Sequence, residues 1–218
     1  MPSPWQCGQI DDSANTEYVV GDVTFEINGW TNPVLGTYDI TSEKLNGSAL
    51  RFPSVDIPVG STILTAYVSV RALADISTTT VNARLTGNLE VNPPIFDDSA
   101  LWRDRRGTLV GGATNNYITT HQVDWNSIAA WTADTWYNSP DISAILQEII
   151  NQAGWASGNP VAIFLDDHNG RSTQTTGVYR MMYGYIDNAA SAPKLYATWS
   201  TGVIVATRAI PLGFIHGQ

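Results

Sequence analysis

Oxygen-bearing side chains gather at the end of a predicted strand, in the run Asp166, Asp167, His168 and Asn169. Carboxylate and carbonyl oxygens are the hard ligands that calcium prefers in proteins. If a metal binds, the sequence predicts calcium as the ion and Asp166 and Asp167 as its ligands. The alternative is a solvated turn, in which the same side chains bond to the neighbouring backbone.

Aromatic residues offer a second kind of chemistry, because eight tryptophans are many for a chain of 218 residues. An exposed ring in a loop can stack on a sugar, whereas a ring in the core only contributes packing. Four rings fall in predicted loops or just before a predicted helix: Trp102, Trp131, Trp136 and Tyr137. We predict these four as glycan-binding residues, with core packing as the open alternative.

Motifs of known catalytic chemistry are missing from the sequence. The histidines, His121, His168 and His216, lie far apart and show no metal-ligand spacing, and no nucleophile motif occurs. The arginines Arg103, Arg105 and Arg106 lie next to acidic residues and predict a local salt-bridge network. Two carboxylates that meet in the fold could still form a glycosidase pair. We predict a protein that is not an enzyme.

The composition narrows the class of partner. The formal net charge is −9, so nucleic acid and anionic membranes are improbable partners for the surface as a whole. Hydrophobic residues make up 43%, enough for a sizeable core, and the single cysteine cannot form an intrachain disulfide. Residues 202–215 are apolar, but they are too short for a membrane span and contain Arg208 and Pro211.

The clearest local pattern predicts a helix near residues 140–152. Ser139 is a suitable N-cap, Pro140 suits the first helical position, and Asp141 suits the first turn. Gly154 then fits the C-terminal cap. The apolar residues of the segment recur at helical spacing and predict one buried stripe: Ile142, Ile145, Leu146, Ile149 and Ile150.

The rest of the chain indicates short strands joined by turns. In residues 62–71, Ile63, Thr65, Tyr67 and Ser69 should share one face of a strand, and the intervening residues the other. Further strands are expected at residues 19–27, 49–52, 78–89, 119–125, 161–165, 178–185 and 195–199. The fold class predicted is mainly β, a jelly-roll-like antiparallel β-sandwich with one short α-helix. We expect an N-terminal arm or irregular edge at 1–40, the sandwich at 41–200 and a C-terminal arm at 201–218.

Three segments in this order carry a resemblance to a known family. They are RFPSVDIPVGSTILTAYVSVRA, then SPDISAILQEIINQAGWASGN, and then APKLYATW. Residues 50–199 resemble jelly-roll modules of the DNRLRE group of carbohydrate-binding-type domains. The resemblance implies a β-sandwich fold, and such modules occur in secreted bacterial surface proteins, in wall-active enzymes and in tailed-phage virions.

The sequence and the resemblance therefore predict two alternative functions. The first is a non-enzymatic structural or adhesion protein of a phage virion, a head decoration or tail component that also binds glycans. A native-looking Met1 without a secretion signal favours this expectation. The alternative is a carbohydrate-binding module of a secreted bacterial polysaccharide-active enzyme, located outside the cell or on its surface.

Apolar and Pro-rich ends predict an assembly. Residues 202–215 are too apolar to leave in water, and residues 1–4 contain two prolines, which lower the entropy lost on docking. We expect the ends to contact other virion proteins or further copies in a homo-oligomer. The alternative for residues 202–207 is an extra edge strand on the same sandwich.

Overall fold

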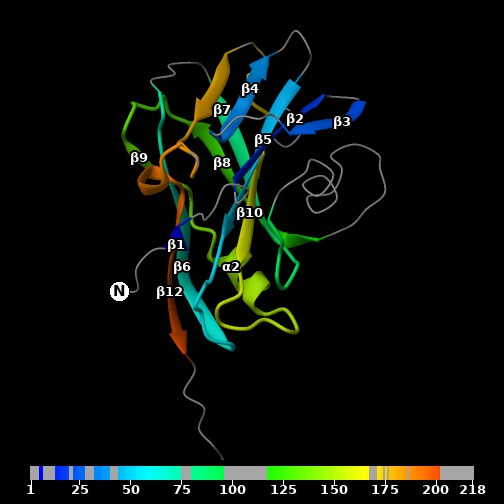
Figure 1. Ribbon diagram of the computed structural model, residues 1–218, viewed down its shortest axis with the longest axis vertical. Coiled ribbons are helices and arrows are strands. Elements are labelled where there is room, and N and C mark those ends of the chain that lie inside the picture. Colours follow the sequence, from blue (N-terminus) through cyan, green and yellow to red (C-terminus); the bar gives the residue numbers. More distant parts are fainter. Residues whose placement is uncertain are drawn as a thin grey trace, which may run out of the picture.

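The computed structural model describes residues 5–6, 13–19, 22–27, 32–39, 44–74, 80–95, 117–166, 171–173, 175, 177–185 and 187–201 (Figure 1). These residues form two β-sheets in which every strand pair is antiparallel. The smaller sheet has the order β1 (Trp5–Gln6), β12 (Lys194–Thr201), β6 (Ser61–Arg71) and β9 (Trp136–Asn138).

The larger sheet joins strands that are distant in the sequence. Its order is β11 (Val178–Met181), β4 (Val34–Asp39), β5 (Lys44–Phe52), β10 (Val161–Asp166), β7 (Val81–Asn88) and β8 (Ile118–Ile128). In addition, β2 (Ser13–Val19) pairs with β5, and β3 (Asp22–Ile27) pairs with β2. A short 3-10 helix, η1 (Ala189–Ser191), precedes β12.

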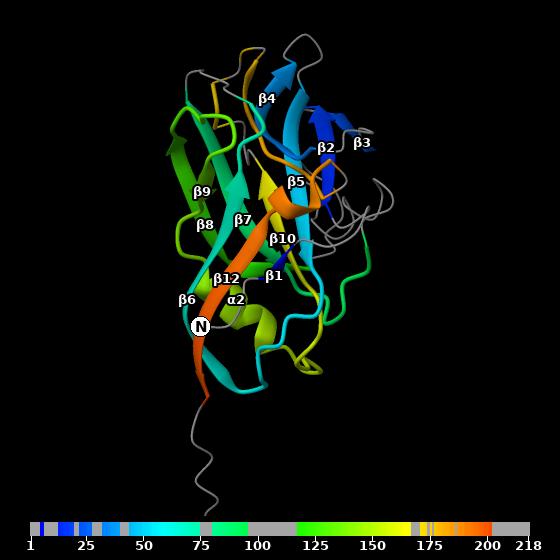
Figure 2. The ribbon, with the colours of Figure 1, turned by 60° about the vertical axis from the view of Figure 1, so that its left-hand side comes forward.

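A single main core lies between the sheets. Leu50, Leu85 and Ile163 reach it from the larger sheet, and Val68 and Leu195 reach it from the smaller one. Figure 2 shows β6 and β12 side by side, with β7 and β10 behind them. The predicted fold class, a mainly β antiparallel sandwich with one short helix, is confirmed for the described residues. The jelly-roll connectivity stays a prediction.

The helix α2 (Ser143–Ile150) closes one end of this core (Figures 1 and 2). The predicted stripe is confirmed, since Ile142, Ile145, Leu146, Ile149 and Ile150 are all at most 2% exposed. Its N-terminus was predicted too early. Ser139 does not cap the helix, and Asp141 precedes its first turn. Ser139 and Asp141 accept hydrogen bonds from the backbone N–H groups of Val68 and Ala66 in β6, and Asp141 also accepts from the N–H of Ser143.

The C-terminal end of α2 also differs from the prediction. The helix ends at Ile150 with Asn151 at the cap position, and Gly154 lies beyond it, in a turn with a φ of 95°. Trp155 then enters the core and donates its indole N–H to the carbonyl of Ile57. Gly154 therefore has the left-handed conformation expected of a cap glycine, but it turns the chain after the helix has ended.

Part of the predicted N-terminal arm belongs to the sandwich. The strand β4 lies within the larger sheet, and Val34 and Leu35 are fully buried. The hydroxyl of Ser48 on β5 donates to the carbonyl of Val34 and accepts from its N–H group. The many Pro, Gly, Asn and Asp residues before residue 40 hid this strand, because its burial depends on a partner strand. Within the described residues, no helix is both long and apolar enough to cross a membrane.

Candidate functional site

The outer face of the smaller sheet, turned away from the core, carries a row of aromatic and polar side chains. On β6, Ala66, Val68 and Val70 point into the core, so the alternating residues point outward. On β12, Leu195 and Ala197 point inward. We call the outward set the outer face: Thr65, Tyr67, Arg71, Trp136, Asn138, Lys194, Tyr196 and Thr198.

A bulge in β6, where Leu64 is the extra residue, changes which side chains reach this face. The register between β12 and β6 shifts at Thr198 and Trp199, so that Trp199 pairs with Ile63. As a result, Ile63 is 8% exposed and Leu64 is 56% exposed. The prediction that Ile63 shares a face with Thr65 and Tyr67 is therefore wrong, because an extra residue reverses the alternation beyond it.

Tyr67 and Tyr196 form the centre of the outer face. They are directly paired across β6 and β12, and their rings stack with centroids 5.0 Å apart and planes 13° apart. Next to them, the hydroxyl oxygens of Thr65 and Thr198 are 2.7 Å apart. Burial, with a smaller contribution from Tyr67, raises the pKa of Tyr196 above its ordinary value. The phenol of Tyr196 is therefore a neutral hydrogen-bonding group at neutral pH.

Trp136 extends the aromatic row onto the third strand. It pairs with Arg71 in register and remains 37% exposed. The ammonium of Lys194 lies over its ring, 4.4 Å from the centroid, which is within the range of a cation–π contact. Ser69 of β6 lies between β9 and β12, paired with Asn138 on one side and with Lys194 on the other. An indole, an amide and an ammonium thus lie close together on the outer face.

A corner held by an ion pair and hydrogen bonds borders the row beyond Arg71. The guanidinium of Arg71 forms an ion pair with Asp134 at 3.0 Å and donates to the hydroxyl of Ser191. Asp134 has a φ of 63° and accepts a hydrogen bond from the phenol of Tyr183. Partial burial and this bond raise the pKa of Tyr183 above its ordinary value. Because its donors already have partners, Arg71 positions the corner.

The predicted glycan-binding residues divide between this face and the core. Trp136 is exposed on the outer face, as the prediction requires. Trp131 is only 3% exposed and packs in the core, so the prediction is wrong for this ring. Tyr137 is half-buried, packs against the core and stacks on Trp131 with centroids 5.2 Å apart. Trp102 lies outside the described residues.

Trp136 is the one residue that the outer face shares with the predicted glycan-binding set. The central residues Tyr67, Lys194 and Tyr196 are among those that the prediction did not include. The sequence contains a signal for two of them, since KLYAT alternates and places Lys194, Tyr196 and Thr198 on one side of a strand. The prediction covered only residues in loops or just before the helix and so did not include these strand residues. Glycan stacking on a strand requires that one sheet face remain open, which the tertiary structure decides.

The predicted metal ligands lie at the other sheet. Asp166 is fully buried at the end of β10, in register with Arg84 of β7, and Asp167 lies outside the described residues. Among the described residues, no three His, Cys, Asp or Glu side chains gather closely enough to hold a metal ion. Arg84 places a positive charge close to Asp166, which opposes a cation there. Calcium binding stays a prediction.

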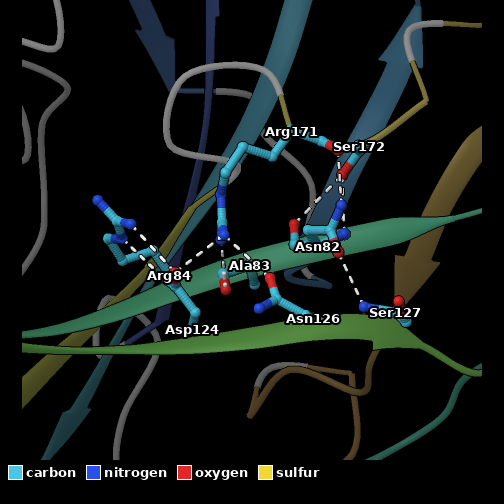
Figure 3. A network of polar contacts seen from close by, with 8 residues as sticks. All are labelled: Asn82, Ala83, Arg84, Asp124, Asn126, Ser127, Arg171 and Ser172. Atoms are coloured by element: carbon cyan, nitrogen blue, oxygen red, sulfur yellow. Dashed lines mark hydrogen bonds and ion pairs between the residues drawn. The ribbon is translucent and has the colours of Figure 1, made fainter.

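A second polar cluster joins the segment after β10 to the β7–β8 pair (Figure 3). Asp124 forms ion pairs with Arg84 at 2.7 Å and with Arg171 at 3.0 Å. The hydrogen bond to Asp124 is the main cause that raises the pKa of Arg84. Arg171 also donates to the amide oxygen of Asn126 and to the carbonyl of Ala83.

Beside these ion pairs, Asn82 fixes the same segment through three further bonds and binds β8 through a fourth. Its N–H donates to the hydroxyl of Ser172, whose own hydrogen bonds to the carbonyl of Asn82. Its amide donates to the carbonyl of Arg171 and accepts from the N–H of Ser127 (Figure 3). These groups bond to one another, so we assign the cluster a structural role and take the outer face of the smaller sheet as the candidate site.

Comparison with known proteins adds no family to this picture. No protein-family model matches the sequence, and no curated protein gives a significant match. The candidate site therefore rests on its geometry.

Proposed function

We propose that the protein is a non-enzymatic adhesion or structural module that binds glycan chains on the outer face of the smaller sheet. The observation that supports this proposal is the aromatic row on that face: Tyr67, Tyr196 and Trp136 come from three adjacent strands and are bordered by polar groups. Apolar rings with a few well-placed polar groups are the usual composition of a small-molecule binding surface.

The chemistry of this face suits a sugar chain. A pyranose ring has apolar C–H faces and a rim of hydroxyl groups, so it needs aromatic surface and hydrogen-bonding groups together. The threonine hydroxyls lie on one side of the tyrosine pair, and Asn138 lies on the side towards Trp136. The aromatic row crosses three neighbouring strands and offers several consecutive positions for sugar rings. Such a surface suits an extended chain better than a single sugar.

We propose a phage virion as the setting, with the protein as a head decoration or tail component. The neutral polar composition and the resemblance of residues 50–199 to modules found in virions support this setting. The alternative is a carbohydrate-binding module of a secreted bacterial polysaccharide-active enzyme, which would use the same face. Mass spectrometry of purified particles separates the two, since only a virion component co-purifies with capsid and tail proteins.

A glycan array with the parent protein and two variants tests the binding proposal. Tyr67→Ala and Trp136→Ala each remove one ring of the row, and we expect each to reduce binding by roughly 3- to 10-fold, as loss of an aromatic contact does. The matched control is Tyr117→Ala, which removes an exposed ring just before β8 of the larger sheet. Equal binding by the control and both ring variants, or no glycan bound by the parent, would refute the proposal.

A further inference from the structure

Lys194 is a cation of the outer face without a carboxylate partner among the described residues. The ion pairs among the described residues involve Arg71, Arg84, Arg171 and His121, and none of them involves Lys194. Its ammonium instead lies over Trp136. A cation–π contact leaves the ammonium its full positive charge, because an aromatic ring supplies a quadrupole and no counter-charge.

Three other cations at the sheet surfaces differ from Lys194, because each has a carboxylate partner. The charge of Arg71 is matched by Asp134, and the charges of Arg84 and Arg171 are matched by Asp124. In a protein with a formal net charge of −9, acidic residues are abundant, yet within the described part of the chain half-buried Lys194 lies beside an indole and has no acidic partner. Its charge is thus available to a ligand seated on the aromatic row.

The surrounding groups define what such a ligand would need. Asn138 lies across Ser69 from Lys194 in the strand register, and the tyrosine pair lies one step further along β6 and β12. A sugar on the row could therefore place an anionic substituent at the ammonium while its ring and hydroxyl groups meet Trp136 and Asn138. An ammonium binds carboxylate and sulfate alike as a compact charge.

The net charge limits the ligand further. A long polyanion would meet the repulsion of a protein with a net charge of −9 over about one Debye length, about 8 Å at physiological salt. An isolated negative charge within a neutral chain meets little of this repulsion and still gains the local contact. We propose that the glycan bound on the outer face carries isolated anionic sugars and that Lys194 recognises their charge. This inference rests on the proposed glycan-binding function.

The test uses matched glycans that differ in one acidic group. The probes are sialyllactose and lactose, sulfated and unsulfated lactose, and xylo-oligosaccharides with and without a glucuronic acid branch, on an array and then by calorimetry. We expect the parent to prefer the charged member of at least one pair by roughly 3- to 10-fold, which is typical of a partly exposed charged hydrogen bond. The sialyl and sulfate pairs distinguish carboxylate from sulfate.

Variants of Lys194 assign the preference to this residue. Lys194→Gln should abolish the preference for the charged member of each pair, and Lys194→Arg should retain it, because the charge is kept. Lys44→Gln is the matched control: it changes the net charge by the same amount on β5 of the larger sheet. Salt should weaken binding of the charged probes and leave neutral probes unchanged.

The outcomes separate this inference from the proposed function. Binding of neutral and charged probes with equal strength, or a preference that survives Lys194→Gln, would overturn the inference and leave glycan binding intact. An array with no bound glycan would instead overturn the proposed function, and the inference with it.

Discussion

Gly87 of β7 lies directly against Ile149 of α2: a Cβ atom at Gly87 would stand 2.6 Å from Cδ1 of that isoleucine. The methyl groups of Ile145 and Thr119 would be 2.9 Å and 3.0 Å away. The N–H of Gly87 also donates to the hydroxyl of Thr119. The helix can therefore rest on the strand only because this position has no side chain.

We expect Gly87→Ala to destabilise the fold by about 1–3 kcal/mol, the usual cost of overpacking a core. Urea unfolding measures the change. Ile149→Val removes the nearest atom, Cδ1, and provides a matched partner for a double-mutant cycle. The combined variant should be more stable than the sum of the two single changes predicts. Strict additivity of the two would mean that the two residues do not crowd each other.

Leu146→Asp tests the packing of α2 on the core. Leu146 is fully buried, so a carboxylate there would lose its hydration without a partner, and we expect a loss of several kcal/mol or failure to fold. Ala144→Asp is the control, because Ala144 is exposed on the same helix. Thermal melting compares them. A Leu146→Asp protein that melts like the parent would show that the helix does not pack as described.

Glu148 gives the stability a specific dependence on pH. Its carboxylate accepts hydrogen bonds from the N–H groups of Thr120 and His121, at 2.7 Å and 3.0 Å, and contacts the His121 ring. Burial acts to raise the pKa of Glu148, but these bonds outweigh it and hold the pKa below its ordinary value. Since the folded pKa lies below the unfolded one, the stabilisation is complete above the unfolded pKa and is lost as pH falls through the folded pKa.

We therefore expect Glu148→Gln to lower the free energy of unfolding at neutral pH and to matter less in acid, where the parent carboxylate is protonated as well. Urea titrations of both proteins from about pH 7 to about pH 3 measure this difference. A deficit that stays constant over the whole range would show that the ionised form of Glu148 does not carry the stabilisation.

Deletion of residues 202–218 tests the predicted assembly, although this segment lies outside the described residues. The chain reaches it from Thr201, which pairs with Ser61 at the end of β6. We expect the truncated protein to keep its melting temperature and to lose self-association or particle binding, measured by light scattering. Unfolding of the truncated protein, with a parent that is monomeric in solution, would place the segment in the core and refute the assembly prediction.

The sequence by itself determined the elements whose patterns are local. Helical spacing alone identified the stripe from Ile142 to Ile150, because a 3.6-residue period needs no knowledge of the partner surface. Alternation likewise located β6 and placed Thr65 and Tyr67 on one face, up to the bulge at Leu64 that reverses the pattern before Ile63. The short strand-like segments and the turn residues between them were sufficient for a mainly β fold class.

Only the tertiary structure decided where competing bonds are made and which rings meet. Asp141 can cap a helix or bond to a strand, and it accepts from both Ser143 and Ala66 because β6 lies alongside. Trp131 and Trp136 have similar local surroundings, yet one packs in the core and the other lies under the ammonium of Lys194. That contact joins β9 to β12, and strand pairing between distant segments is a property of the whole chain, which no local pattern records.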